Sequence, residues 1–135
     1  MKSRDSLIRL TKFQVDEKRR QLAQIEMMVA DCERMARELD EQILIEQQKS
    51  GIEDVNHYAY PTFAKAAIQR RDNLNTSISE LQAQMDAAKD DLAVAIEELK
   101  KYELMAERDK ARTQAVQDQT EQIELDEIAA RSAGH

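Results

Sequence analysis

The sequence has no tryptophan, one proline, two glycines and one cysteine, and aromatic residues make up 4% of its 135 residues. Large aromatic side chains supply much of the buried surface of compact cores, and glycine and proline dominate turns. A chain so poor in both is typical of long solvated helices rather than of several packed layers. Alternating runs of β-branched and aromatic residues, which indicate strands, are also missing. The sequence therefore predicts an all-α fold.

Other absences restrict location and partners. The single cysteine cannot form a disulfide within the chain and fits a reducing compartment. No segment approaches the roughly 18 apolar residues of a membrane span, and the charged N-terminal stretch lacks the apolar run of a secretion signal. A formal net charge of −7 argues against general binding to nucleic-acid phosphates. We expect a cytoplasmic protein that binds no nucleic acid and has no stable membrane insertion.

No group of residues points to catalysis, a cofactor or a metal ion. His57 and His135 are the only histidines, and neither has a second ligand at metal-binding spacing. No nucleophile is paired with a base, and the isolated Gly51 and Gly134 cannot form a phosphate-binding loop. The many Asp and Glu residues indicate a solvated helix surface. We expect no enzyme activity, no catalytic residues, no cofactor and no metal site.

The stretch 51–61 divides the chain into two expected helices, because it holds the only proline and the only glycine before the C-terminal tail. Gly51 can adopt the left-handed conformation that ends many helices. Pro61 suits the first position of a helix, where a backbone N–H would have no partner. Gly51 is therefore expected to end one helix, and Pro61 is expected to begin the next.

These signals predict one domain over residues 1–135. Its first helix would cover about 3–49, its connector about 50–60 and its second helix about 61–131. A connector this short folds the chain back as a helical hairpin. The second helix would be the longer one.

On both sides of the connector, mostly apolar residues recur every three or four positions, which is the spacing of a coiled-coil seam. In the first helix the seam comprises Ile8, Thr11, Val15, Lys18, Leu22, Ile25, Val29, Cys32, Ala36, Leu39, Ile43 and Glu46. In the second it comprises Tyr60, Ala64, Ala67, Arg71, Leu74, Ile78, Leu81, Met85, Ala88, Leu92, Ala95, Leu99 and Tyr102. A weaker continuation runs through Ala106, Asp109, Thr113, Val116, Thr120, Ile123, Glu127 and Ala130.

A hairpin would pair the two seams in antiparallel orientation, with Leu22 near Ala88. Lys and Arg outnumber Asp and Glu over residues 1–20, and the reverse holds over 86–109, so flanking charges favour this pairing. Beyond about Arg108 the second helix has no partner within the chain. We expect that end to fray in isolation and to be ordered by a binding partner. The predicted fold is a long two-helix antiparallel coiled-coil hairpin.

Two sets of residues outside the seam are candidates for partner binding. Ile45, Tyr58, Phe63 and Ile68 lie close to the turn, where they either cover the tip of the hairpin or form a contact patch. The basic pair Arg19–Arg20 either forms surface salt bridges or docks against an acidic partner. Three methionines beside the seam either widen the packed face or offer an adaptable partner surface; they are Met27, Met28 and Met35.

Four segments resemble the flagellar export protein FliJ in its alphaproteobacterial form. They are Met1–Leu10, Phe13–Arg20, Tyr58–Ala66 and Gln69–Leu74, and the similarity covers about the whole chain. The resemblance implies an antiparallel two-helix coiled coil similar to the central stalk subunit of rotary ATPases. It also implies a soluble component of the flagellar type III export apparatus.

The resemblance further implies the partners and the position of the protein. Family members bind the hexameric export ATPase, promote assembly of its ring, and contact the cytoplasmic domain of the export gate and export chaperones. By analogy with rotary stalks, the end with both termini would enter the ring at the base of the export apparatus, and the turn would face the gate. Position and expected exposure assign Arg19, Arg20, Val116 and Ile123 to the ATPase, and Ile45, Tyr58, Phe63 and Ile68 to the gate.

Two other functions fit the same sequence. The apolar residues near the turn could grip unfolded export substrates, which would make the chain a holding chaperone. Alternatively, the chain could be a generic structural coiled coil that dimerises in parallel, with one continuous helix through the central stretch. Each alternative lacks the binding to the export ATPase that the first interpretation requires.

Overall fold

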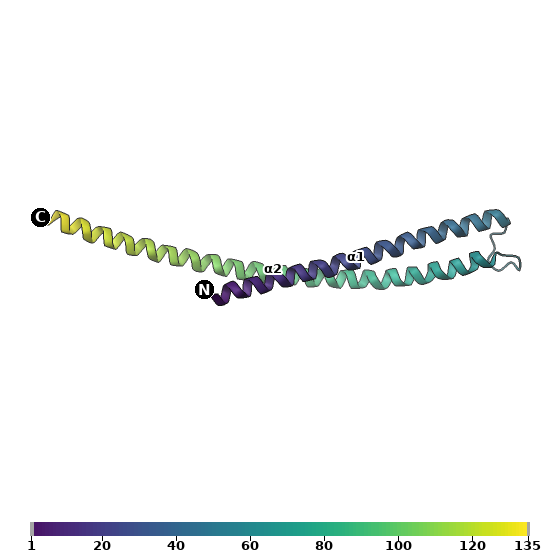
Figure 1. The fold of residues 1–135 in the computed structure, drawn as a ribbon, viewed down its shortest axis with the longest axis horizontal. Helices are drawn as coiled ribbons and strands as arrows, with labels where there is room; N and C mark the ends of the chain where they lie inside the picture. The colour runs from purple at the N-terminus through teal and green to yellow at the C-terminus, as the bar shows by residue number, and fades with distance from the viewer. Residues whose placement is uncertain (1, 135) are drawn as a thin grey trace. The chain divides into compact units, whose positions relative to one another are not determined.

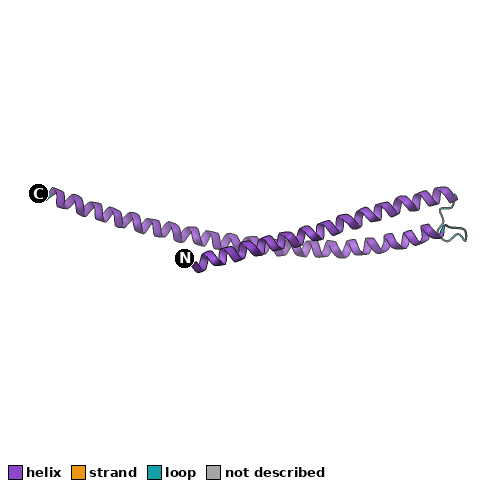
Figure 2. Cartoon of the chain, viewed as in Figure 1, coloured by secondary structure: helices purple, strands orange, loops and turns teal. Residues whose placement is uncertain are grey.

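The computed structural model describes residues 2–134 and contains two helices within them (Figures 1 and 2). Helix α1 spans Lys2–Ser50 and helix α2 spans Thr62–Ala133. Among the described residues there is no strand. The two helices pack as a hairpin and α2 is the longer, so the predicted fold class is confirmed. The chain turns at 51–61, which removes the parallel dimer with a continuous central helix as an alternative.

The contacts divide the chain into two compact units. The turn unit covers residues 16–93 and includes the connector. The terminal unit combines the first residues of α1, up to Val15, with the part of α2 that begins at Val94. The expectation of a single domain over the whole chain stays a prediction.

The core of the turn unit is the predicted seam. Its residues with the smallest exposed fractions are Val29, Ala36, Ile43, Tyr60, Ala64, Ala67 and Leu81. Ala64 is 0% exposed, because small side chains next to the turn let the two backbones approach closely. Cys32, a seam residue, is half-buried and free. Hydrophobic burial along this stripe is what holds α1 and α2 together.

The terminal unit continues the same pattern with Val15 and Ala95 buried. Its seam also contains the polar residue Thr11, which is 2% exposed. The Thr11 hydroxyl donates a hydrogen bond of 2.8 Å to the Leu7 carbonyl oxygen, so its polar atom keeps a partner after burial. Every predicted seam position from Ile8 to Asp109 is buried or half-buried.

Polar contacts fix the antiparallel register. In the turn unit, Arg71 Nη1 donates to Asp40 Oδ1 at 3.0 Å, and Gln47 Nε2 donates to the Tyr60 hydroxyl at 2.9 Å. In the terminal unit, Arg4 forms an ion pair with Asp109. Each pair joins an early position to a late one, as antiparallel helices require.

The connector is built from consecutive hydrogen-bonded turns. Gly51 ends α1 in the left-handed conformation, with φ of 71°, and its N–H donates to the Gln47 carbonyl at 2.9 Å. The Pro61 carbonyl accepts the first helical hydrogen bond of α2, from Lys65 at 3.1 Å. His57 Nδ1 accepts a 3.0 Å hydrogen bond from the Ala59 N–H, so this exposed histidine serves the turn.

Replacing Gly51 by alanine should lower the free energy of unfolding by about 1 kcal/mol, because a Cβ disfavours positive φ. A Cβ there would meet no atom within 4 Å, so the loss is conformational rather than steric. Urea denaturation followed by circular dichroism measures it. Gly51→Asn is the matched control and should lose clearly less, since asparagine tolerates this conformation. Equal losses for the two variants would contradict the explanation.

Candidate partner-binding surfaces

The turn unit has two chemically different sides. On each helix, the residue just before a seam residue lies on one side of the seam, and the residue just after it lies on the other side. In an antiparallel pair, the residues just before the seam residues of both helices share one side of the hairpin. Met28 and Met35 of α1 and Phe63 of α2 occupy such positions, and we call this the methionine side. Their exposed fractions are 52%, 38% and 56%. The opposite side of α1 carries charged residues such as Glu33 and Asp40 instead.

A groove of about 390 Å³ opens on the methionine side between the two helices. Its lining comprises Met35, Glu38, Leu39, Gln42, Arg70 and Leu74. Arg70 forms no ion pair with any residue of the described range 2–134. The groove therefore offers Arg70 beside flexible apolar side chains, and its one carboxylate, Glu38, is paired with Arg34 at 3.2 Å, which suits contact with another protein.

The turn-end residues predicted to contact the gate are not all on one surface. Ile45 and Phe63 are 48% and 56% exposed, and both belong to the methionine side. Tyr58 is 96% exposed in the connector, where it stacks on His57 with ring centroids 4.7 Å apart. Ile68 is half-buried and follows the seam residue Ala67, which places it on the charged side. The structure thus groups Ile45 with Phe63 and separates Ile68 from them.

The basic pairs Arg19–Arg20 and Arg70–Arg71 differ in how many ion pairs they form. Arg20 forms an ion pair with Glu17, one turn earlier on α1, and Arg19 is exposed. Arg71 donates to Asp40 at 3.0 Å and to Asp72 at 3.1 Å. These hydrogen bonds, that to Asp40 first, raise the pKa of Arg71 above its ordinary value. Arg71 therefore stays charged at every physiological pH.

In the terminal unit, the last part of α2 is exposed along its whole length. Every described residue from Lys110 onward is exposed, with Val116 at 62% and Ile123 at 52%. The seam spacing continues here but faces no other helix of the unit. Leu125 and Ile128 are also exposed, at 59% and 57%. They lie outside the seam, so the spacing of apolar residues did not identify them as candidates.

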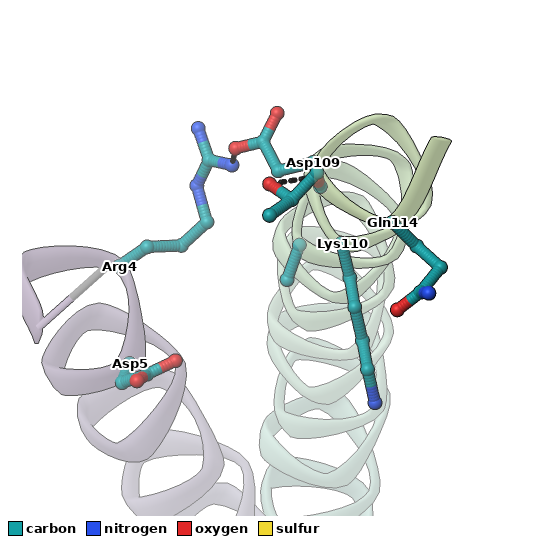
Figure 3. Close-up of a pocket in the computed structure, with 7 residues that line it drawn as sticks. Arg4, Asp5, Asp109, Lys110 and Gln114 are labelled. Atoms are coloured by element: carbon teal, nitrogen blue, oxygen red, sulfur yellow. Dashed lines mark hydrogen bonds and ion pairs between the residues drawn. The ribbon is translucent and has the colours of Figure 1, made fainter. Parts of the chain in front are cut away.

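Figure 3 shows where the pairing of α1 with α2 ends in the terminal unit. Arg4 and Asp109 point toward each other across a hollow of about 400 Å³, with Asp5, Lys110 and Gln114 around it. The Arg4 guanidinium also donates to the Met105 carbonyl at 3.3 Å. Arg4 and Asp109 are paired with each other across this hollow, so it closes the helix pair rather than forming a ligand site.

The described residues hold no group of three or more His, Cys, Asp or Glu side chains that could bind a metal ion. Nor does either helix, within that range, contain an apolar stretch sufficient to cross a membrane. What the structure offers instead is helix surface: the methionine side, the turn end and the exposed end of α2.

The exposed end of α2 should exchange its amide hydrogens faster than the paired seam. Leu81 is buried against α1, whereas Val116 has only its own helix to protect it. We expect exchange at Val116 to be at least about 100-fold faster than at Leu81 in the isolated monomer. Hydrogen exchange followed by mass spectrometry or NMR measures this ratio. Equal protection at the two positions would show that the end is stable without a partner.

Comparison with known proteins assigns the chain to a family. The family model described as "Flagellar FliJ protein" matches residues 1–135, the whole chain. No curated protein and no solved structure matched. Because the match spans both helices and the connector, the chain belongs to the family of the flagellar FliJ protein, a component of the flagellar protein export apparatus.

Proposed function

We propose that this chain is a non-enzymatic stalk that binds the export ATPase ring and links it to the export gate and to export chaperones. The observation that carries the proposal is the exposed end of α2, which leaves apolar seam residues without a partner in the terminal unit. Apolar seam residues that face no second helix of the chain become buried when a helix or groove of another protein packs against them. The stalk would act in the cytoplasm, peripherally at the base of the export apparatus.

The ATPase contact would combine apolar and basic residues. Val116 and Ile123 stand seven residues apart, so both lie on one side of α2 and could enter an apolar surface of the ring. Arg19 and Arg20 would contribute where the ring presents acidic side chains. Arg20 would first have to leave Glu17, at little cost because exposed ion pairs contribute only about 0.2–1 kcal/mol.

The gate contact would lie at the turn. Ile45 and Phe63 are exposed on the methionine side, and Tyr58 projects from the connector. Exposed aromatic residues are frequent anchors of protein interfaces. Ile68, half-buried on the other side, would support the helix pair beneath this contact or meet the gate at its edge. The chaperones would use Met28 and Met35, farther along the methionine side, because flexible side chains adapt to different partners.

The proposal is tested with the purified export ATPase and the cytoplasmic domain of the gate. The full chain should be retained by each protein in a pull-down and should change the ATP hydrolysis rate of the ATPase. Bovine serum albumin and an unrelated helical hairpin serve as controls. A chain that binds neither protein and leaves hydrolysis unchanged would refute the stalk function.

The exposed apolar residues near the turn favour one other function, that of a holding chaperone. Tyr58, Phe63 and Ile45 could bind unfolded segments of export substrates. Such a chaperone would suppress aggregation of a denatured substrate at stoichiometric amounts without binding the ATPase. The two functions are separated by measuring aggregation and ATP hydrolysis in parallel.

A further inference from the structure

One side of the terminal unit exposes apolar residues from both helices. Leu7 and Leu10 of α1 are 38% and 53% exposed, and Met105 of α2 is 38% exposed. All three lie outside the seam, so packing of α1 against α2 does not account for them. Met105 also precedes the exposed end of α2, which begins at Lys110, so these residues are separate from that end.

Helix geometry places these side chains together. Leu7 precedes the seam residue Ile8, and Met105 precedes the seam residue Ala106. In an antiparallel pair such positions flank the same side. Leu10 lies one turn after Leu7 and widens the apolar stripe on that side. The two helices are close here, because Arg4, one turn before Leu7, donates to the Met105 carbonyl at 3.3 Å.

Two cations border the stripe on α2. Lys101 and Arg108 lie four residues before and three residues after Met105, so they share its side of the helix. They line a surface hollow of about 520 Å³ together with Glu97, Lys100, Leu104 and Met105, so three cations and one carboxylate surround it. Lys101 and Arg108 are exposed, and neither forms an ion pair with any residue between 2 and 134. The face thus combines an apolar stripe with a positively charged edge.

We propose that this face, formed by Leu7, Leu10, Met105, Lys101 and Arg108, binds an amphipathic helix of a partner protein whose one edge is acidic. The partner's apolar residues would cover Leu7, Leu10 and Met105, and its carboxylates would pair with Lys101 and Arg108. The result is a local three-helix bundle. The proposal does not rest on the stalk function, because it uses none of the residues assigned to the ATPase or to the gate.

Charge favours a protein helix over the other occupants. An extended anionic membrane surface would face the whole chain, which has a net charge of −7, whereas one acidic edge of a helix would reach only Lys101 and Arg108. The acidic part of a second copy that could meet this face is its exposed segment 114–128. Val116 and Ile123 lie on one side of that segment, and Leu125 and Ile128 lie elsewhere, so only two of its apolar side chains could cover Leu7, Leu10 and Met105.

The test uses the full chain and two fluorescent peptides about three heptads long. Both carry leucines at coiled-coil spacing; one has glutamates along one edge of the stripe, and the other has lysines there. Fluorescence anisotropy should show the glutamate peptide binding at least about tenfold more tightly than the lysine peptide. The double variant Lys101→Glu/Arg108→Glu should weaken binding of the glutamate peptide at least about tenfold and improve binding of the lysine peptide.

Lys12→Glu/Lys110→Glu is the matched control, since each lysine directly follows a seam residue and lies on the opposite side of the same two helices. It should change binding by less than about threefold. Leu10→Gln should weaken the binding of both peptides while leaving the circular dichroism spectrum of the chain unchanged. Equal binding of the two peptides, or equal losses in the two double variants, would overturn the proposal. So would binding only to vesicles of phosphatidylcholine and phosphatidylglycerol, or self-association through this face in sedimentation equilibrium.

Discussion

Replacing Ala64 by aspartate should lower the free energy of unfolding by about 3–5 kcal/mol. Ala64 is 0% exposed and packs at the start of α2, where the seam residues are small. A carboxylate there would lose its hydration, and its added atoms would force the helices apart. Urea denaturation of the isolated chain, followed by circular dichroism at the helix minimum, measures the change.

Ala66→Asp is the matched control, because it makes the same substitution two residues later, at an exposed position of the same helix. Its loss should stay below about 1 kcal/mol, which covers the lower helix propensity of aspartate. If the two variants lost similar stability, Ala64 would not be a seam residue. The hairpin pairing next to the turn would then be wrong.

The double variant Val116→Glu/Ile123→Glu should abolish the effect of the chain on export ATPase hydrolysis, lowering its apparent affinity by at least about 100-fold. Both residues belong to one side of the exposed end of α2. Charging that side would place carboxylates where the proposed contact is apolar, in a segment that is already acidic. Titration of the hydrolysis rate against chain concentration measures the effect.

Leu125→Glu/Ile128→Glu provides the comparison, since it adds the same charges to the same exposed stretch but outside the seam. It should reduce the affinity by less than about tenfold. The stability of both variants should match that of the unaltered chain, because none of these residues is buried. Equal loss of activity in both variants would show that charge, rather than the continued seam, governs binding.

The spacing of apolar residues predicted the hairpin because spacing reports directly on burial. It placed even Arg71 and Lys18 in the seam, and both are half-buried. It could not say how a charged seam residue is tolerated. Arg71 is tolerated because Asp40, across the helix pair, accepts its hydrogen bond. That partner depends on the register between two helices, which no local pattern contains.

The candidate surfaces were harder to predict for the same reason. Ile45, Phe63 and Ile68 are all apolar and close to the turn, but grouping Ile45 of α1 with Phe63 of α2 requires the antiparallel orientation of the two helices. The groove beside Arg70 also requires both helices, since its lining alternates between them. Exposure of Val116 and Ile123 followed from helix length alone, and there the prediction agrees with the structure.

The turn has a consequence for the order in which the chain folds. The contact between Gln47 and Tyr60 spans 13 positions of sequence, that between Asp40 and Arg71 spans 31, and that between Arg4 and Met105 spans 101. The entropy lost on closing a loop rises with its length, so the contact beside Gly51 is the least costly to make first. Each pair of seam residues that forms then shortens the loop that the next pair, farther from the turn, has to close. Pairing that spreads outward from the turn therefore lets the two helices associate quickly, even though Arg4 and Met105 are far apart in sequence.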